Sequence, residues 1–203
     1  MSASLAMISQ GNWPLAVVIY SLAAVGFSGG NIFYDSFLVF VAPKERLDYV
    51  SGLGYAMGYL GGGLLFTINV IMVLKPTLFG LSSEAQAVQV SFISVAVWWA
   101  LFSLPLILFV DEGKSQQAQK GIGLVTTGFK QIIKTLKEIR KYKMISLFLI
   151  AYWLYIDGVD TIIRMAIDYG MSIGFSSENL IVALLITQFV GFPAAIAFGK
   201  AGQ

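Results

Sequence analysis

Five long apolar stretches constrain the fold of this chain more than any other feature of its sequence. Each is close to the roughly 20 apolar residues that a helix needs to cross a bilayer core. The 203 residues are 57% hydrophobic and 12% charged, whereas a soluble domain is about 25% charged. None of the stretches shows the alternation of an outer-membrane strand. We therefore predict an all-α membrane protein with five transmembrane helices, at about residues 14–41, 50–74, 87–110, 144–167 and 180–198.

A polar segment, residues 111–143, separates the third stretch from the fourth. In its second part, apolar residues recur every three or four positions with Lys and Arg between them, which predicts an amphipathic helix. Such a helix either lies at the membrane surface or packs on its own protein. We divide the chain into 1–110 with three spans, a linker at 111–143, and 144–203 with two spans. The apolar positions are Ile122, Val125, Phe129, Ile132, Leu136 and Ile139.

The placement of basic residues predicts the orientation. If the linker is cytoplasmic, that side carries Lys44, Arg46, eight residues of the linker and Lys200, while the opposite side carries Lys75 alone. Cytoplasmic loops hold an excess of Lys and Arg, so we expect the linker inside. The sequence has no N-x-[ST] glycosylation acceptor, in keeping with a bacterial inner membrane.

The absence of Cys and His from the sequence excludes several kinds of chemistry within this chain. Structural zinc, haem held through His or Cys, thiol chemistry and Ser-His-Asp catalysis all need one of these residues. One basic segment is the sole feature in favour of nucleic-acid binding. We expect no enzyme, no cofactor, no metal site and no nucleic-acid partner.

The fourth stretch carries three ionisable residues on one predicted helical face: Asp157, Asp160 and Arg164. Each costs about 2.5–3.5 kcal/mol at a bilayer centre on insertion scales, so each is a functional candidate. Asp160 and Arg164 are four residues apart and can neutralise each other. Asp157 then lacks a partner on its own helix, and becomes the candidate for proton coupling or for binding a cationic group. Gln188 in the fifth stretch is a candidate hydrogen-bonding neighbour.

The first stretch holds a second polar group, with Asn31 and Asp35 one turn apart and Tyr34 beside them. Asp35 is about six residues, or roughly 9 Å, from the inner end of its span. It could therefore also pair with Lys44 or Arg46 at the interface. Ionisable residues inside the stretches occur only in the first and fourth. Two helices lining a polar cavity, with three facing lipid or protein, would produce this pattern.

A charged loop lies between the first two stretches. It contains Lys44, Glu45, Arg46 and Asp48. These charges are either simply solvated or form a latch that favours one conformational state, for which a few kcal/mol suffice.

Glycines recur every four residues in the second stretch, at Gly54, Gly58 and Gly62. On a helix they share one face and permit close packing against a neighbour. Their other interpretation is that they allow the helix to bend or slide during a conformational cycle.

Three segments resemble a known family. "NIFYDSFLVFVAPKERLDYVSGLGYAMGYLGGG" (31–63), "FLIAYWLYIDGVDTIIRMAIDYG" (148–170) and "TQFVGFPAAIAFGK" (187–200) are similar to the vacuole-effluxer-like branch of the major facilitator superfamily. The resemblance implies that the five stretches correspond to helices four to eight of a twelve-helix transporter, with the linker between its halves. It also implies that the first and fourth stretches line the central cavity. "GYLGG" is similar to the superfamily's glycine-rich antiporter motif but lacks its proline.

The resemblance implies a secondary active transporter that moves a small polar solute, with amino-acid efflux as the expected activity. Alternating access rocks two halves around a central site, so the expected partners are the bilayer, the solute and the missing helices of the same transporter. The chain is then a fragment, a truncated reading frame or a reduced relative. The alternative function is a non-transporting multi-span scaffold or assembly subunit.

Overall fold

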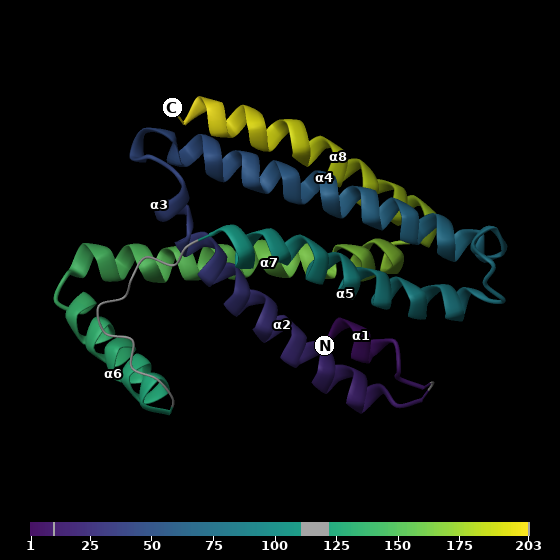
Figure 1. Ribbon diagram of the computed structural model, residues 1–203, viewed down its shortest axis with the longest axis horizontal. Helices are drawn as coiled ribbons and strands as arrows, with labels where there is room; N and C mark the ends of the chain where they lie inside the picture. Colours follow the sequence, from purple (N-terminus) through teal and green to yellow (C-terminus); the bar gives the residue numbers. More distant parts are fainter. Residues whose placement is uncertain (10, 111–121, 203) are drawn as a thin grey trace. The chain divides into compact units, whose positions relative to one another are not determined.

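The computed structural model describes residues 1–9, 11–110 and 122–202, with side chains described from residue 126 onward in the last range. All regular structure in these ranges is helical (Figure 1). The predicted all-α fold is therefore confirmed. The first part of the linker, residues 111–121, lies outside the described residues, as do the side chains of Ile122 and Val125.

Five helical segments are long and apolar enough to cross a membrane, which confirms the predicted number. The first consists of two helices, α2 (Trp13–Ser36) and α3 (Leu38–Val41). The second begins with the short η1 (Lys44–Arg46) and continues as α4 (Leu47–Leu74). The others are α5 (Glu84–Phe109), α7 (Lys143–Ser172) and α8 (Ser177–Ala201). The short α1 (Ser2–Leu5) and η2 (Pro76–Phe79), together with α6 (Ile122–Ile139), complete the described helices.

Local capping signals decide where the spans end. The α7 helix continues to Ser172 and stops where Gly174 adopts a positive φ of 97°. The N–H of Phe175 then donates to the carbonyl of Gly170 at 3.0 Å, as in a Schellman motif. At the start of α5, the Ser83 hydroxyl accepts from the N–H of Gln86 at 3.2 Å. The cap at Gly174 explains why α7 extends five residues beyond its predicted end at 167, and the Ser83 cap sets the start of α5 at Glu84.

The chain divides into two compact units, residues 1–111 with 181–203, and residues 112–180. In the first unit, α4 contacts α5 and lies beside α8 over much of its length (Figure 1). The few buried apolar residues of α4 are Ala56 and Met72, and Ala87 is buried on α5. The Ser94 hydroxyl of α5 donates to the Asn69 side-chain oxygen of α4 at 3.0 Å. Small buried residues and one interhelical hydrogen bond are typical of membrane helix packing.

Backbone-to-backbone contact holds α4 against α8. A Cβ atom placed on Gly52 would lie 2.8 Å from the carbonyl oxygen of Ala195 and 2.8 Å from the Cα of Gly199. A Cβ on Gly199 would in turn lie 3.1 Å from the carbonyl oxygen of Asp48. Neither glycine can carry a side chain without moving a backbone, so glycine here permits the close approach.

The same contact continues along both helices through two further glycines. A Cβ on Gly63 of α4 would lie 3.2 Å from the Cβ of Gln188, and one on Gly191 of α8 would lie 2.7 Å from the ring of Tyr59. We call Gly52, Gly63, Gly191 and Gly199 the glycine seam.

The second unit contains α6, α7 and the first turn of α8. The α6 helix ends at Ile139, and the Ser146 hydroxyl of α7 donates to the Ile139 carbonyl at 3.0 Å. The predicted linker helix is therefore present, and its C-terminal end is joined to the first turns of a membrane span. At the other end of α7, the Leu180 side chain packs on Gly170, where an added Cβ would lie 2.6 Å from it.

Candidate functional site

The α7 helix places its ionisable residues near its middle. Asp157 is the fifteenth of its 30 residues, and Asp160 and Arg164 follow on the next two turns. All three side chains are exposed in the chain, as is the neighbouring Trp153. Seven residues separate Asp157 from Arg164, which is about 10 Å along a helix. An acid and a base therefore lie on one helical face, with a second acid between them.

A hydroxyl group binds the backbone beside Asp157. Thr161 donates its side-chain hydroxyl to the carbonyl oxygen of Asp157 at 2.8 Å. A Thr hydroxyl bonded to the carbonyl four residues earlier bends a helix slightly. Gly158, one residue away, would meet no described atom within 4 Å if it carried a Cβ. The segment that carries the two acids is therefore open and locally adaptable.

The polar group of the first span lies at a break in the helix. Asn31, Tyr34 and Asp35 occupy the last two turns of α2, which ends at Ser36. The N–H of Phe37 donates to Tyr34 at 3.1 Å, three residues back instead of four. The Ser36 hydroxyl donates to the Phe33 carbonyl at 2.6 Å. The predicted single span is thus two helices, and Asp35 lies next to their junction.

The position of Asp35 has an electrostatic consequence. The C-terminal end of a helix carries partial negative charge on its carbonyl groups. A carboxylate in the last turn of α2 adds negative charge to that end. Such an arrangement attracts a cation. Broken helices whose carbonyl ends meet a cation are a recurrent device of transporters.

Tyr34 connects this polar turn to the glycine-rich face of α4. A Cβ on Gly54 would lie 3.2 Å from the Tyr34 hydroxyl oxygen. Gly58 and Gly62 would meet no described atom within 4 Å, so their role in helix packing stays a prediction. The glycines of α4 that meet α8 are instead Gly52 and Gly63 of the glycine seam. Gly52 and Gly63 are eleven residues apart, which is about three turns, so both lie on one face of α4. This spacing of glycines could also be read from the sequence.

Gln188 and the charged loop both lie at the contact between α4 and α8. Gln188 is half-buried, with its Cβ against Gly63. Its role as a neighbour of Asp157 stays a prediction. Lys44, Glu45 and Arg46 form η1, and Asp48 follows in the first turn of α4, where a negative charge is favourable.

Asp48 marks one end of a groove along the two helices. The groove has a volume of about 640 Å³, and Tyr55, Tyr59 and Phe198 contribute to its lining. A Cβ on Gly202 would lie 3.2 Å from a carboxylate oxygen of Asp48. The charged loop is therefore next to the end of α8, as a latch would require. Its role as a latch stays a prediction.

The predicted site residues thus belong to two compact units. Asn31, Tyr34, Asp35 and Gln188 are in the first, and the ionisable residues of α7 are in the second. The structure brings Tyr34 to α4 and Gln188 to the glycine seam. That α2 and α7 line one shared cavity stays a prediction.

Comparison with known proteins identifies the family. The family model described as vacuole effluxer Atg22 like matches residues 42–201. The chain belongs to this family. This vacuole effluxer-like chain is 39% identical over 203 residues to the uncharacterized MFS-type transporter YxiO of Bacillus subtilis (strain 168), which covers 100% of the chain and 47% of the relative. No solved structure matches it.

More distant relatives of the vacuole effluxer-like chain are fungal. It is 25% identical over 166 residues to autophagy-related protein 22 of Yarrowia lipolytica, covering 72% of the chain and 27% of that protein. The Kluyveromyces lactis protein of the same name is 22% identical over 183 residues, covering 82% and 36%. The chain therefore spans less than half the length of these relatives. The resemblance seen in the sequence is confirmed, and the family is one of multi-pass membrane transporters of the major facilitator type, not of enzymes.

Proposed function

We propose that the chain is the part of a secondary active transporter that carries one wall of its solute pathway. The observation that carries this proposal is the distribution of charge over the described spans. Five or more residues in from either end of each span, Asp, Glu, Lys and Arg occur only at Asp35 of the first span, Trp13–Val41, and on α7. Ionisable residues inside a membrane face a pathway or a partner, because lipid cannot solvate them. Membership of a transporter family favours a role in a solute pathway over the alternative role of a non-transporting scaffold.

The solute that fits these groups is small, polar and zwitterionic. Asp157 can hold an ammonium group or a coupling proton, and Arg164 can hold a carboxylate. Asp160 lies between them on the same face and balances Arg164. An amino acid carries both complementary charges, so amino acids are the solute class that we propose. Asn31, Tyr34 and Asp35 would contribute hydrogen bonds and a second cation-attracting position.

The glycine seam supports alternating access as the mechanism. At Gly52 and Gly199 the two helices meet through backbone atoms and not through interlocked large side chains. Helices in such contact can shift or separate along their line of contact without repacking a core. The charged loop, next to the end of α8, is in a position to favour one of the two states. The proposed location is a bacterial inner membrane, and the proposed partners are the remaining helices of the same transporter.

Counterflow in proteoliposomes tests the proposed function. The protein, expressed as its gene encodes it, is reconstituted into vesicles loaded with unlabelled amino acids. We expect transient accumulation of an external radiolabelled amino acid, absent from protein-free vesicles, and a faster uptake when a proton gradient is imposed. A helical, monodisperse protein that gives no counterflow with any amino acid would contradict the proposal and favour the scaffold.

A further inference from the structure

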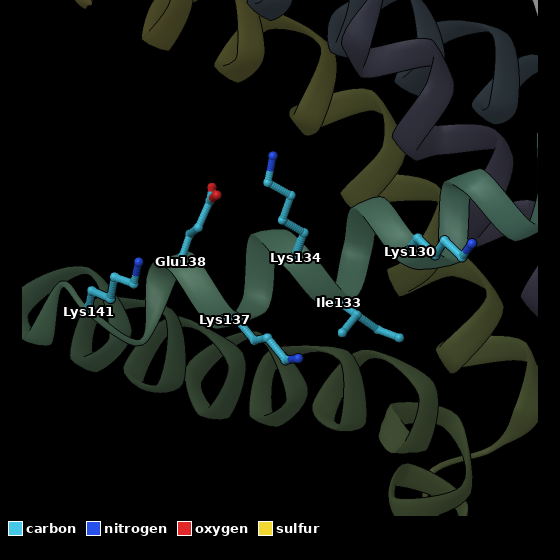
Figure 2. Close-up of a pocket in the computed structure, with 6 residues that line it drawn as sticks. All are labelled: Lys130, Ile133, Lys134, Lys137, Glu138 and Lys141. Atoms are coloured by element: carbon cyan, nitrogen blue, oxygen red, sulfur yellow. The ribbon is translucent and has the colours of Figure 1, made fainter.

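Four lysines lie along α6 and the turn that follows it. Lys130, Lys134, Lys137 and Lys141, which we call the basic ridge, border an open hollow of about 340 Å³ together with Ile133 and Glu138. In Figure 2, Lys134 and Glu138 extend to one side of the helix, while Lys137 and Ile133 extend to the other. From Lys130 to Lys137 the ridge follows α6 over seven residue steps, or about 10 Å, and Lys141 lies two residues beyond the end of the helix. The ridge contributes four positive charges to the border of the hollow, and Glu138 contributes one negative charge.

The apolar face of α6 begins directly beside the basic ridge. Around a helix of 3.6 residues per turn, Lys137 and Lys130 lie only about 40° and 60° from Ile133. Lys134 lies farther away, at about 100°. The apolar side chains Phe129, Ile132, Ile133 and Leu136 are all more than half exposed in the chain. Apolar and basic surfaces therefore share one edge.

The attachment of α6 to α7 holds one end of α6 beside the start of a membrane span. Only three residues separate the end of α6 at Ile139 from Lys143, the first residue of the α7 span. The N–H of Tyr142 donates to the Ile139 carbonyl at 2.8 Å, and the Ser146 hydroxyl donates to the same carbonyl at 3.0 Å. These contacts hold the C-terminal end of α6 at the start of the α7 span, where a membrane helix meets the lipid head groups.

We infer that the basic ridge is a binding site for the phosphate groups of anionic phospholipids. The apolar face would enter the acyl boundary, as in other interfacial helices. The lysine stems would follow the apolar surface and place their ammonium groups among the phosphates. Each Lys near an anionic surface strengthens binding by about fivefold. This inference concerns lipid recognition by the linker and does not depend on the proposed transport.

A polarity-sensitive label on α6 tests the inference. The chain has no Cys, so Ile132→Cys provides a single labelling position on the apolar face. The whole purified protein, in neutral-detergent micelles, is titrated with phosphatidylglycerol or with phosphatidylcholine. We expect the label to respond at a mole fraction of phosphatidylglycerol at least tenfold lower than that of phosphatidylcholine. Raising the salt concentration should reduce this difference.

Two matched variants separate the ridge from overall charge. Replacing the four ridge lysines with Gln should remove the preference for phosphatidylglycerol. Replacing Lys44, Arg46, Lys75 and Lys200 with Gln removes the same charge elsewhere and should preserve it. Within the ridge, K130Q with K137Q should weaken binding more than K134Q with K141Q, because Lys130 and Lys137 lie nearer the apolar face than Lys134 does, and Lys141 lies beyond the end of α6. A variant with Arg in place of all four ridge lysines should retain the preference for phosphatidylglycerol. It keeps the inference testable if the Gln variant fails to fold, because loss of the preference in the Arg variant would contradict a site for positive charge.

Three results would overturn the inference. The first is an unchanged preference in the four-lysine Gln variant, or an equal loss in the control variant. The second is displacement of phosphatidylglycerol by millimolar inorganic phosphate, which would identify a site for a soluble anion. The third is a label that reports apolar surroundings before any lipid is added and responds to neither lipid. This result would show that protein covers the apolar face of α6.

Discussion

Asp157 is the strongest candidate for a functional residue in the chain. It lies at the middle of a 30-residue membrane helix, where a charge is costly, and its side chain is exposed in the chain. The nearest base on its own helix, Arg164, is two turns away with Asp160 between. An acidic residue is tolerated in this position when a proton, a solute or a neighbouring helix neutralises its carboxylate.

Substitution of Asp157 tests whether it couples transport to protons. Asp157→Asn keeps the size and polarity of the side chain but cannot release a proton. We expect a loss of about a hundredfold or more in uptake driven by a proton gradient, because a positioned proton-transfer group contributes about 10²–10⁴-fold to a rate. Gradient-driven uptake and solute counterflow are measured in the same proteoliposomes. Asp168→Asn, three turns along α7, is the matched control and should retain most of the rate. Wild-type uptake by Asp157→Asn at every pH would remove this residue from the mechanism.

Ser36 stabilises the break in the first span. Its hydroxyl satisfies the Phe33 carbonyl, since the N–H of Phe37 bonds to Tyr34 instead. In Ser36→Ala that carbonyl loses its partner, so we expect a loss of about 0.5–1.5 kcal/mol of stability. Thermal unfolding in detergent, followed by tryptophan fluorescence, measures the change. Ser28→Ala, on the same helix, is the control, because among the described residues its hydroxyl has no hydrogen bond. Equal melting temperatures for the two variants would contradict this role.

At the scale of the helices, two glycines of α4 differ in their surroundings, Gly52 in the glycine seam and Gly58 outside it. A Cβ on Gly52 would meet two backbone atoms of α8 at 2.8 Å, whereas one on Gly58 would meet no described atom within 4 Å. Gly52→Ala should therefore force α4 and α8 apart at a cost of about 1–3 kcal/mol. Gly58→Ala should be neutral or stabilising by up to about 1 kcal/mol, because Ala is the better helix former. Melting temperatures of the two variants in one detergent make the comparison. A Gly52→Ala protein as stable as Gly58→Ala would mean that the seam is looser than described.

The sequence was sufficient for the number and type of the spans because length and hydropathy alone decide whether a segment can cross a bilayer. The ends of the spans depend on caps such as Ser83 and Gly174, which act over one turn and are invisible to an average over 20 residues. The break after Ser36 has neither Pro nor Gly at the junction, so composition gave no signal for it.

The packing face of α4 could not be chosen from sequence for a different reason. Six glycines lie between residues 52 and 63 and cover several faces of the helix. The spacing of four residues that links Gly54, Gly58 and Gly62 is one choice, and the spacing of eleven that links Gly52 and Gly63 is another. The side chains and backbone of α8 select the second. The candidate site on α7 was accessible from sequence because charge in an apolar segment needs no partner to be recognised.

At the scale of the whole molecule, the basic residues and the spans together constrain orientation. Five spans that each cross the membrane predict that the loop before α4, the linker and the end of α8 lie on one side, and η2 on the other. The first side carries eleven Lys and Arg residues, counted as Lys44, Arg46, eight in 111–143 and Lys200. The second carries Lys75 in its loop. The charge difference and the number of spans are independent observations, and both are satisfied by a single topology.

Labelling of single cysteines tests this topology without altering any charged residue. Because the chain has no Cys, Thr77→Cys in η2 and Thr135→Cys in α6 each provide one exposed thiol. The excess of Lys and Arg predicts that α6 is cytoplasmic. A membrane-impermeant maleimide added to intact bacterial cells should therefore label Thr77→Cys and leave Thr135→Cys unmodified until the cells are opened. The reverse pattern would place the basic ridge outside the cell, and would show that the positive-inside bias does not orient this protein.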